Sequence, residues 1–385
     1  MVESKLIWLI NVGEPLPNEG NKPHRMSIWK FFLEKDGYKV NYITTNFEHQ
    51  RKKWINVELD GYIAIKSFIS YNKNISVRRL LNHFFLSISL LLFLLKAPKK
   101  PDLIIVSYPT MLLSLASTIY GKISGITVFV DVRDKWPDIF IKGKMTKLVI
   151  FPLIVIKKII FNCSSLNIAI SPGYEEWVKS SSPSSKTEII PLTKNYVIEK
   201  QKFFDGVINF SFVGTLGDTY DLEMIFNLEK LLDQRRINFQ INICGDGPKA
   251  KYIQNRINTK NIVFHGWLAE TELQSVLDHT HFGLMFYNKS SPQGWPNKLF
   301  EFMSNGIPIL NTLKGESYKL IKEKKLGYNI SSEFDIDSVL GKILNDIESK
   351  QYFQIVRNNY DTFKRNFSND SGNRKLLSLI KKHLS

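Results

Sequence analysis

Cysteine is scarce in this chain: Cys163 and Cys244 are the only two among 385 residues, and they lie far apart. No Cys-x-x-Cys pair exists, so the sequence supports neither a zinc knuckle nor a disulfide framework. Each cysteine stands beside apolar residues, which predicts two buried, reduced thiols in a cytosolic protein. The N-terminus also lacks the basic region, long apolar region and cleavage site of a signal peptide. Its short apolar run predicts a first β-strand.

Acidic residues are too few to balance the basic ones. The chain has 36 Asp and Glu against 52 Lys and Arg, which gives a net charge of +16. Such an excess indicates an anionic partner: nucleic acid, an acidic membrane surface or a phosphorylated substrate. The apolar fraction of 43% is that of a folded protein, and the length predicts two or three domains.

Strand and helix patterns alternate along the chain in two series. The first series has strands near residues 5–12, 39–44, 102–107, 127–132, 167–170 and 188–190, with helices at 26–36 and 111–123. The second has strands near 209–213, 239–243, 261–265, 282–287 and 307–310, with helices at 222–233 and 270–278. Such alternation implies parallel sheets covered on both faces. We therefore predict an α/β protein with two Rossmann-like doubly wound domains facing each other across a cleft, which meet near residue 200.

Two apolar segments interrupt this alternation. Residues 84–95 are nearly continuously apolar and are bracketed by arginines and lysines, and residues 147–161 are apolar with two internal lysines. Residues 84–95 fall short of the roughly 20 apolar residues that a spanning helix needs. Both segments fit core helices under the sheet. They also fit a surface that enters the headgroup layer of an acidic membrane, which the net charge favours.

Residues 296–308, PNKLFEFMSNGIP, follow a strand and open a helix. The free amides and the dipole at a helix start favour an anion. Lys298 in the first turn can pair with a phosphate, and Glu301 lies one turn deeper on the same face. A carboxylate accepts two hydrogen bonds from a vicinal diol such as that of ribose. The segment therefore fits a nucleoside diphosphate, and it fits equally an ordinary amphipathic helix with a solvated Lys–Glu pair.

Glycine loops and a charged loop follow other predicted strands. The loops FVGTLG at 212–217, ICGDGP at 243–248 and VFHGWL at 263–268 all lie in the second series. In the first series, residues 131–138 close a strand with three carboxylates and an arginine. Such a set is costly unless paired or functional. Two interpretations remain: a structural Arg–Asp network, or contact with sugars by Asp134 or Arg133.

Taken in order, these motifs resemble those of the family 4 retaining glycosyltransferases, which have the GT-B fold, and of their bacterial surface-polysaccharide type. The resemblance implies that Glu301 holds the donor ribose and that Lys298 holds the diphosphate. Gln293 stands where many members have a glutamate that contacts the donor sugar. The implied domains are an acceptor-binding domain at 1–200, a nucleotide-sugar-binding domain at 201–365, and a helix at 366–385 that packs back on the first.

The resemblance also implies the site residues. The catalytic candidates are Asp134, Arg133 and Lys298, and no metal site is expected because no Asp-x-Asp motif appears in a metal-binding context. A loop over donor and acceptor includes Gly13, Glu14, Gly20 and Arg25. The nucleotide-sugar would be bound by Gly214, Thr215, Gly217, Gly245, Gly266, Trp267, Gln293, Asn297, Lys298, Leu299 and Glu301.

The function implied is transfer of a sugar, with retention, from a nucleoside-diphosphate sugar to a glycan or lipid-linked acceptor in bacterial surface polysaccharide synthesis. No cofactor and no nucleic acid partner are expected. The enzyme would lie in the cytoplasm, peripherally bound to the acidic inner face of the cell membrane. Two alternatives share the fold: a nucleotide-sugar 2-epimerase, which needs no membrane-facing surface, and a non-catalytic nucleotide-sugar-binding partner, which Gln293 makes conceivable.

Overall fold

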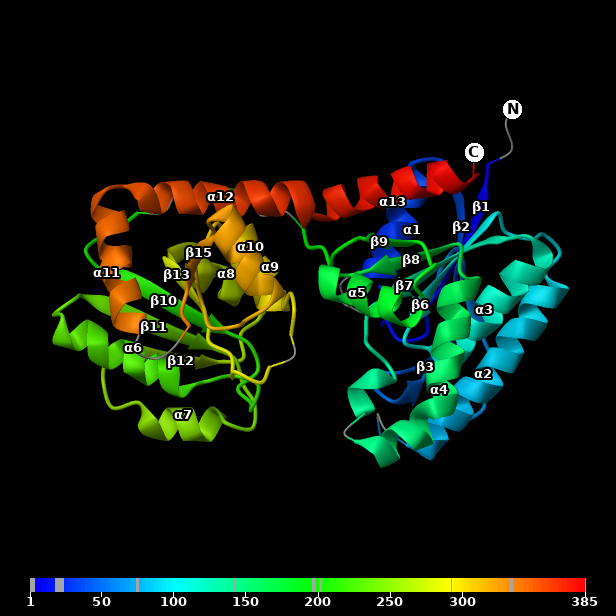
Figure 1. The fold of residues 1–385 in the computed structure, drawn as a ribbon, viewed down its shortest axis with the longest axis horizontal. Coiled ribbons are helices and arrows are strands. Elements are labelled where there is room, and N and C mark those ends of the chain that lie inside the picture. The colour runs from blue at the N-terminus through cyan, green and yellow to red at the C-terminus, as the bar shows by residue number, and fades with distance from the viewer. Residues whose placement is uncertain are drawn as a thin grey trace. The chain divides into compact units, whose positions relative to one another are not determined.

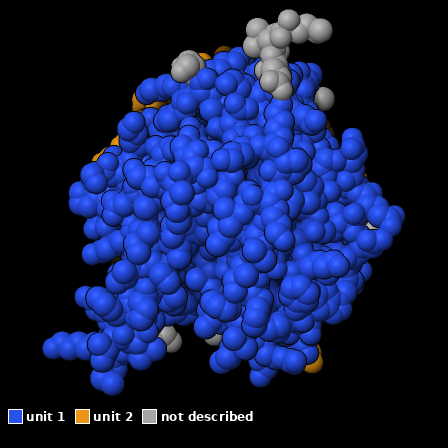
Figure 2. All heavy atoms as spheres, turned by 90° about the vertical axis from the view of Figure 1, so that its right-hand side faces the viewer, with its two compact units in different colours: residues 1–192, 372–385 blue, residues 193–371 orange. Residues whose placement is uncertain are grey.

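The computed structural model describes residues 4–17, 24–73, 76–141, 143–195, 199–200, 203–291, 293–331 and 335–384, and Figure 1 shows their elements. The chain divides into two compact units. Unit 1, blue in Figure 2, holds residues 1–192 and 372–385, and unit 2 holds residues 193–371. The chain thus passes between units at residues 192 and 193, and it returns to unit 1 within its last helix, α13 (Asn369–Leu384).

Unit 1 contains a seven-stranded sheet with the order β5-β2-β1-β6-β7-β8-β9. All of its pairings are parallel. The strands are β1 (Leu6–Ile10), β2 (Lys39–Thr45), β5 (Tyr62–Ile65), β6 (Leu103–Tyr108), β7 (Thr127–Val132), β8 (Leu166–Ala169) and β9 (Thr187–Ile189). The strand order reverses between β1 and β6, which is where ligands of such sheets bind. A small antiparallel hairpin, β3 (Phe47–Glu48) and β4 (Lys53–Trp54), stands apart from this sheet.

Helices cover both faces of this sheet, because successive strand side chains point to opposite faces. Trp8 and Ile10 face the core under α2 (Val77–Lys96), α3 (Met111–Ser124), α4 (Lys144–Cys163) and α5 (Pro172–Ser181). Ile7 and Leu9 face the core under α1 (Arg25–Lys35) and α13. A short 3-10 helix, η1 (Asp138–Phe140), precedes α4.

Helix α2 is longer than its sequence pattern predicted. It has 20 residues, and by length and composition alone it is long and apolar enough to cross a membrane. The estimate from residues 84–95 was therefore too short. The side chain of Ser76 caps the helix by accepting a hydrogen bond from the Arg79 amide at 3.2 Å. Leu86, Leu90 and Leu94 are buried in the core of unit 1, so one stripe of α2 packs on the sheet.

Unit 2 contains a six-stranded parallel sheet with the order β12-β11-β10-β13-β14-β15. Its strands are β10 (Ile208–Val213), β11 (Phe239–Cys244), β12 (Ile262–Gly266), β13 (Phe282–Met285), β14 (Ile309–Asn311) and β15 (Gly327–Asn329). Its helices are α6 (Glu223–Gln234), α7 (Ala250–Arg256), α8 (Glu270–His279), α9 (Asn297–Ser304), α10 (Glu316–Lys324), α11 (Asp335–Glu348) and α12 (Gln351–Asn366). The strand order reverses between β10 and β13. Two doubly wound α/β units confirm the predicted fold class.

Candidate active site

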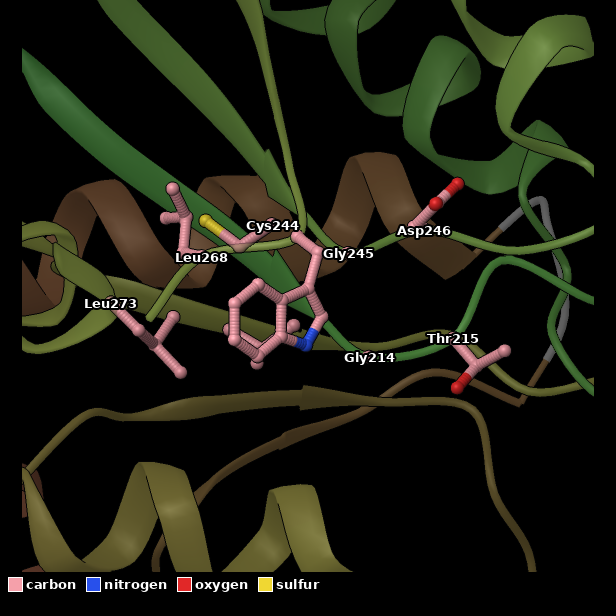
Figure 3. Close-up of a pocket in the computed structure, with 9 residues that line it drawn as sticks. Gly214, Thr215, Cys244, Gly245, Asp246, Leu268 and Leu273 are labelled. Carbon is pink, nitrogen blue, oxygen red and sulfur yellow. The ribbon is translucent and has the colours of Figure 1, made fainter. Parts of the chain in front are cut away.

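A cavity of about 230 Å³ lies at the carboxyl ends of the strands of unit 2. Its walls come from the residues that follow β10, β11 and β12, including Gly214, Thr215 and Gly245, as Figure 3 shows. Leu268, Leu273 and Trp267 complete the wall, and the Trp267 side chain is 76% exposed. A cavity with backbone on one side and exposed indole on the other suits a flat, polar ligand.

The glycines of two of these loops allow backbone to pack on backbone. Gly245 has φ +155°, and a Cβ there would lie 1.9 Å from the Gly214 oxygen. Gly247 has φ +151°, and its Cβ would lie 2.6 Å from the Leu216 oxygen. The Leu216 amide donates to the Asp246 oxygen at 2.9 Å and holds the two loops together. The sequence predicts Gly245 as a nucleotide-sugar-binding residue, and the structure adds this packing requirement.

Lys298 lies at the point where the strand order reverses. Its Nζ is 3.6 Å from the ring centre of Phe212, 4.0 Å from that of Tyr220 and 5.4 Å from that of Tyr287. A Cβ built on Gly214 would lie 3.6 Å from the same Nζ, so the amine borders the first glycine loop. The structure thus brings together two of the predicted site residues, which are more than 80 positions apart in sequence.

The Lys298 amine has no hydrogen-bond partner among the residues that the structure describes. The residue is only 6% exposed, and burial lowers the pKa of this ammonium well below its ordinary value. The faces of the three aromatic rings favour the charged form of the amine. They do not offer it an oxygen or nitrogen atom as a hydrogen-bond acceptor. An anion at the Gly214 loop would restore the charged form by direct pairing.

Glu301 pairs with Lys194 and not with Lys298, the basic residue that the sequence placed beside it. Its carboxylate forms an ion pair with Lys194, which lies in the segment that enters unit 2. The pair is made through Oε2, and the Glu301 side chain is 24% exposed. Sequence reasoning placed Lys298 and Glu301 on one face with a common ligand and missed Lys194, because nothing in the sequence near that lysine marks it as a partner.

The remaining predicted residues of unit 2 differ in accessibility. Leu299 is fully buried and packs in the interior of α9. Asn297 and Gln293 are exposed. Gly266 has φ +69°, and its carbonyl accepts a hydrogen bond from the Gly245 amide at 2.7 Å. A Cβ on Gly217 would meet no atom within 4 Å.

In unit 1, a buried charge network lies beside the point where the strand order reverses. Arg25 donates to both Asp131 oxygens at 3.1 and 3.2 Å, and Arg133 lies 3.5 Å from Asp131. Arg133 also pairs with Glu14 and donates to the Ser107 hydroxyl at 2.7 Å. Two carboxylates and two guanidiniums therefore balance one another, which is how buried charges are tolerated.

Glu14 is therefore anchored at the carboxyl end of β1. It accepts from the Met26 amide at 3.1 Å, at the start of α1, and its side chain is 5% exposed. The Gly13 amide donates to the Asn11 side chain at 2.8 Å. Gly20, the other predicted loop residue, lies outside the described residues.

Asp134 and Arg133 differ in their surroundings. Arg133 belongs to the balanced network, and its side chain is 21% exposed. Asp134 accepts from the amide of Lys135 at 2.8 Å, and burial raises the pKa of its carboxyl despite that bond and the nearby Arg79. Among the described residues, Asp134 forms no ion pair like those of Arg133, although Arg79 acts on it electrostatically.

Cys244 is buried and Cys163 half-buried, and both are free thiols. Burial raises the pKa of Cys244 to about 12. Among the described residues, no group of three or more His, Cys, Asp and Glu is placed to hold a metal ion.

Known proteins share this architecture. Residues 224–370 match the family described as glucosyltransferase 3-like, C-terminal domain. Among curated proteins, none matched the sequence. HepE from Anabaena in complex with UDP is similar, with a TM-score of 0.65 at 12% identity over 98% of this chain and 100% of HepE.

Two further solved structures have the same arrangement. Sucrose-phosphate synthase from Thermosynechococcus elongatus has a TM-score of 0.67 at 13% identity, with 98% of each chain covered. The lipopolysaccharide outer core galactosyltransferase WaaB has a TM-score of 0.60 at 17% identity over 98% of this chain and 99% of WaaB. The chain therefore has the GT-B fold of glycosyltransferases, and its residues 224–370 are similar to the C-terminal domain of glucosyltransferase 3-like proteins.

Proposed function

We propose that this protein is a retaining glycosyltransferase that moves a sugar from a nucleoside-diphosphate sugar to the hydroxyl of a glycan or lipid-linked acceptor. The GT-B fold and the family match support the class. The observation that carries the proposal is the buried amine of Lys298, which borders the Gly214 loop and has no hydrogen-bond partner among the described residues. A bound anion would supply the hydrogen-bond acceptor and the opposite charge that this amine needs.

The diphosphate would be the leaving group, and its charge grows as the glycosidic bond breaks. The Gly214 and Leu216 amides are already bonded to the Cys244 and Asp246 carbonyls, so the loop would contribute through Thr215 and Gly217. Lys298 is fixed by its packing before the reaction, so it stabilises that charge without reorganisation. Because Lys298 supplies the positive charge that a metal ion would otherwise bring to the diphosphate, we propose that transfer needs no metal. Activity that persists in EDTA is the expected result, and activity restored only by a divalent cation would contradict it.

The nucleoside would lie along the 230 Å³ cavity. The exposed Trp267 indole offers a face for the base, since aromatic stacking suits any base. Glu301, whose side chain is partly exposed, would accept the ribose hydroxyls, with Lys194 fixing the carboxylate. Gln293 and Asn297 are exposed and free to approach the donor sugar.

Unit 1 would bind the acceptor at the carboxyl edge of its sheet. The balanced network of Glu14, Arg25, Asp131 and Arg133 sets the position of the loops there. Asp134, with its raised pKa, would contact the acceptor sugar. In this proposal the charge network positions the loops, and Asp134 contacts the acceptor sugar.

The apolar helices of unit 1 support a peripheral place on an acidic membrane, with the enzyme on the cytoplasmic side. Exposed apolar side chains are Val77, Leu80, Leu81, Phe84, Phe85, Ile88, Leu91, Leu92 and Leu95 on α2, and Met145, Leu148, Val149, Phe151, Val155 and Ile159 on α4. Exposed basic residues in and beside these helices are Arg78, Lys96, Lys99, Lys100, Lys144, Lys147 and Lys158. Apolar burial combined with attraction to anionic headgroups is the physical basis of interfacial helix binding.

Flotation with liposomes tests the membrane proposal. The chain should float with vesicles that contain phosphatidylglycerol and less with pure phosphatidylcholine. Leu92→Glu should weaken flotation, whereas Phe203→Glu, at an exposed apolar residue of unit 2, should not. Equal flotation of both variants, or none with acidic vesicles, would sink the membrane proposal.

Sugar transfer is tested with a panel of radiolabelled nucleotide-sugars and membrane extracts as acceptor. We expect incorporation that Lys298→Met and Glu301→Gln abolish, and that Lys319→Met, at an exposed lysine of the same unit, leaves intact. Release of an epimerised nucleotide-sugar without acceptor would replace transfer with epimerisation. Nucleotide binding without any turnover would indicate a binding protein.

A further inference from the structure

An open cavity of about 550 Å³ lies on the β3–β4 hairpin of unit 1. His49, Gln50 and Lys52 from the hairpin line it, together with Asn72 from the segment before α2. Lys52 is one of four non-glycine residues with positive φ in the described part of the chain, at +55°. The turn therefore holds a lysine at the cavity in a conformation that L-residues seldom adopt.

Two histidines, a lysine and an arginine converge beside this cavity, and burial and Arg79 lower the pKa of the Lys52 ammonium. The Nδ1 of His49 lies 2.7 Å from the Tyr71 hydroxyl and 3.3 Å from the Lys52 Nζ. The ring of Tyr71 packs edge-on against His83 of α2, with centroids 6.4 Å apart. The Arg79 guanidinium lies 5.9 Å from the centre of the same Tyr71 ring. The hairpin, the segment before α2 and the first turns of α2 thus meet in one basic cluster.

The electrostatics of the cluster are those of an anion site. Burial and the neighbouring Arg79 and Lys52 lower the pKa of His49 to about 4. Burial, Arg79 and His49 lower the pKa of His83 to about 4 as well. The carboxylate on the hairpin, Glu48, is 7% exposed and lies 3.6 Å from Arg51. The imidazoles are therefore neutral in a positive field that an incoming anion would offset.

We propose that this cavity binds the phosphate or diphosphate group of a membrane-anchored molecule. Arg79 and His83 belong to α2, whose neighbouring Leu80 and Phe84 are exposed apolar side chains. A phosphate here would lie at headgroup level while the apolar face of α2 enters the lipid. Arg79 also lies 5.5 Å from the centre of the Trp136 ring and acts electrostatically on Asp134, so the basic cluster borders the loop at which acceptor sugar is expected. The inference rests on the proposed membrane-bound transferase.

Two sources share this chemistry: the diphosphate of a lipid-linked acceptor and the headgroup of an acidic phospholipid. The first test uses inorganic pyrophosphate and the full chain carrying Lys298→Met, so that the donor site of unit 2 does not compete. Carbon-labelled imidazoles report locally, with assignment from His49→Gln and His83→Gln. We expect saturable shifts of both signals and a rise of both pKa values, because the anion stabilises each imidazolium.

Charge variants then test the cavity itself. Lys52→Gln should raise the pyrophosphate dissociation constant about tenfold, the loss of one charge-assisted contact. Lys53→Gln, at the next, exposed lysine of the hairpin, should change it by less than about twofold. Unmoved histidine signals, or equal losses from both variants, would overturn the proposal. Melting temperatures show whether each variant is folded.

Vesicles separate the two sources. Phosphatidylcholine vesicles carrying a polyprenyl diphosphate sugar are compared with vesicles carrying phosphatidylglycerol. A loss by Lys52→Gln on the first alone identifies an acceptor subsite, and a loss on the second alone identifies a headgroup subsite. Unchanged binding to both overturns the inference. UDP binding by Lys52→Gln is measured in parallel, because its loss would point to failure in unit 2 and not at the hairpin.

Discussion

Replacement of Lys298 by methionine should raise the free energy of unfolding of the ligand-free protein and weaken its binding of nucleotide. Methionine keeps the unbranched shape of lysine and packs well against aromatic rings. In the free protein it removes an amine that has no hydrogen-bond partner among the described residues. Such burial costs about 1–3 kcal/mol, and the cation–π contacts return about 0.5–2 kcal/mol. The net gain expected is about 1 kcal/mol, or about 2–4 °C in the melting temperature.

With UDP present, the sign should reverse. The amine supplies a charge-assisted contact to the diphosphate that is worth about 1.5–3 kcal/mol. Its loss should raise the dissociation constant about ten- to one-hundredfold. Thermal melts with and without UDP, combined with calorimetric titration, measure both effects, and Lys319→Met serves as a control. A variant that melts lower than the parent and binds UDP with unchanged affinity would refute this account of Lys298.

The same lysine sets a pH dependence. Its folded-state pKa is lowered by burial, whereas the unfolded chain has the ordinary value near 10.5. Between those two values the unfolded state binds more protons, so the free energy of unfolding rises with pH across that window. Bound diphosphate raises the folded-state pKa and should flatten this slope. Lys298→Met should flatten it even without ligand.

Three further predictions concern packing and charge. Gly245→Ala should unfold unit 2 at a markedly lower temperature, because its Cβ would meet a backbone oxygen at 1.9 Å, whereas Gly217→Ala should have little effect, since nothing lies within 4 Å. Denaturant melts would show the contrast. Glu14→Gln should destabilise unit 1 by about 1–3 kcal/mol, since it removes one charge-assisted contact and leaves the half-buried Arg133 with Asp131 alone. In native protein at neutral pH, the Cys244 thiol should resist alkylation, because its pKa is raised to about 12 and the thiolate is the nucleophile, and it should react once the chain is unfolded.

The sequence pattern predicted the fold well, because alternating strands and amphipathic helices repeat with regular spacing. The strand at Thr127–Val132 has the predicted bounds, and the strands that carry the glycine loops lie within a residue or two of prediction. Helix α2 was underestimated, because its first turns carry Arg78, Arg79, Asn82 and His83 and do not continue the apolar run. Its capping serine and buried leucine stripe extend it to 20 residues.

Less of the candidate site than of the fold could be predicted from the sequence. The glycine loops and Lys298 could be placed at one sheet edge, because the carboxyl ends of parallel strands share an edge. The rings around Lys298 come from a strand end and two loops, and each looks like an ordinary core aromatic in the sequence. The Lys194–Glu301 pair joins residues 107 positions apart. Local periodicity holds no information on such contacts.

The two units treat buried charge in opposite ways at equivalent places. In unit 1, Glu14 and Asp131 offset Arg25 and Arg133, so removal of one member unbalances the charges that remain and destabilises the fold. In unit 2, the Lys298 ammonium is offset by aromatic faces alone among the described residues, so its removal should stabilise the fold. A charge that costs stability in the free protein persists where a ligand completes it. The opposite signs expected for Glu14→Gln and Lys298→Met therefore distinguish a charge that supports structure from one that awaits an anion.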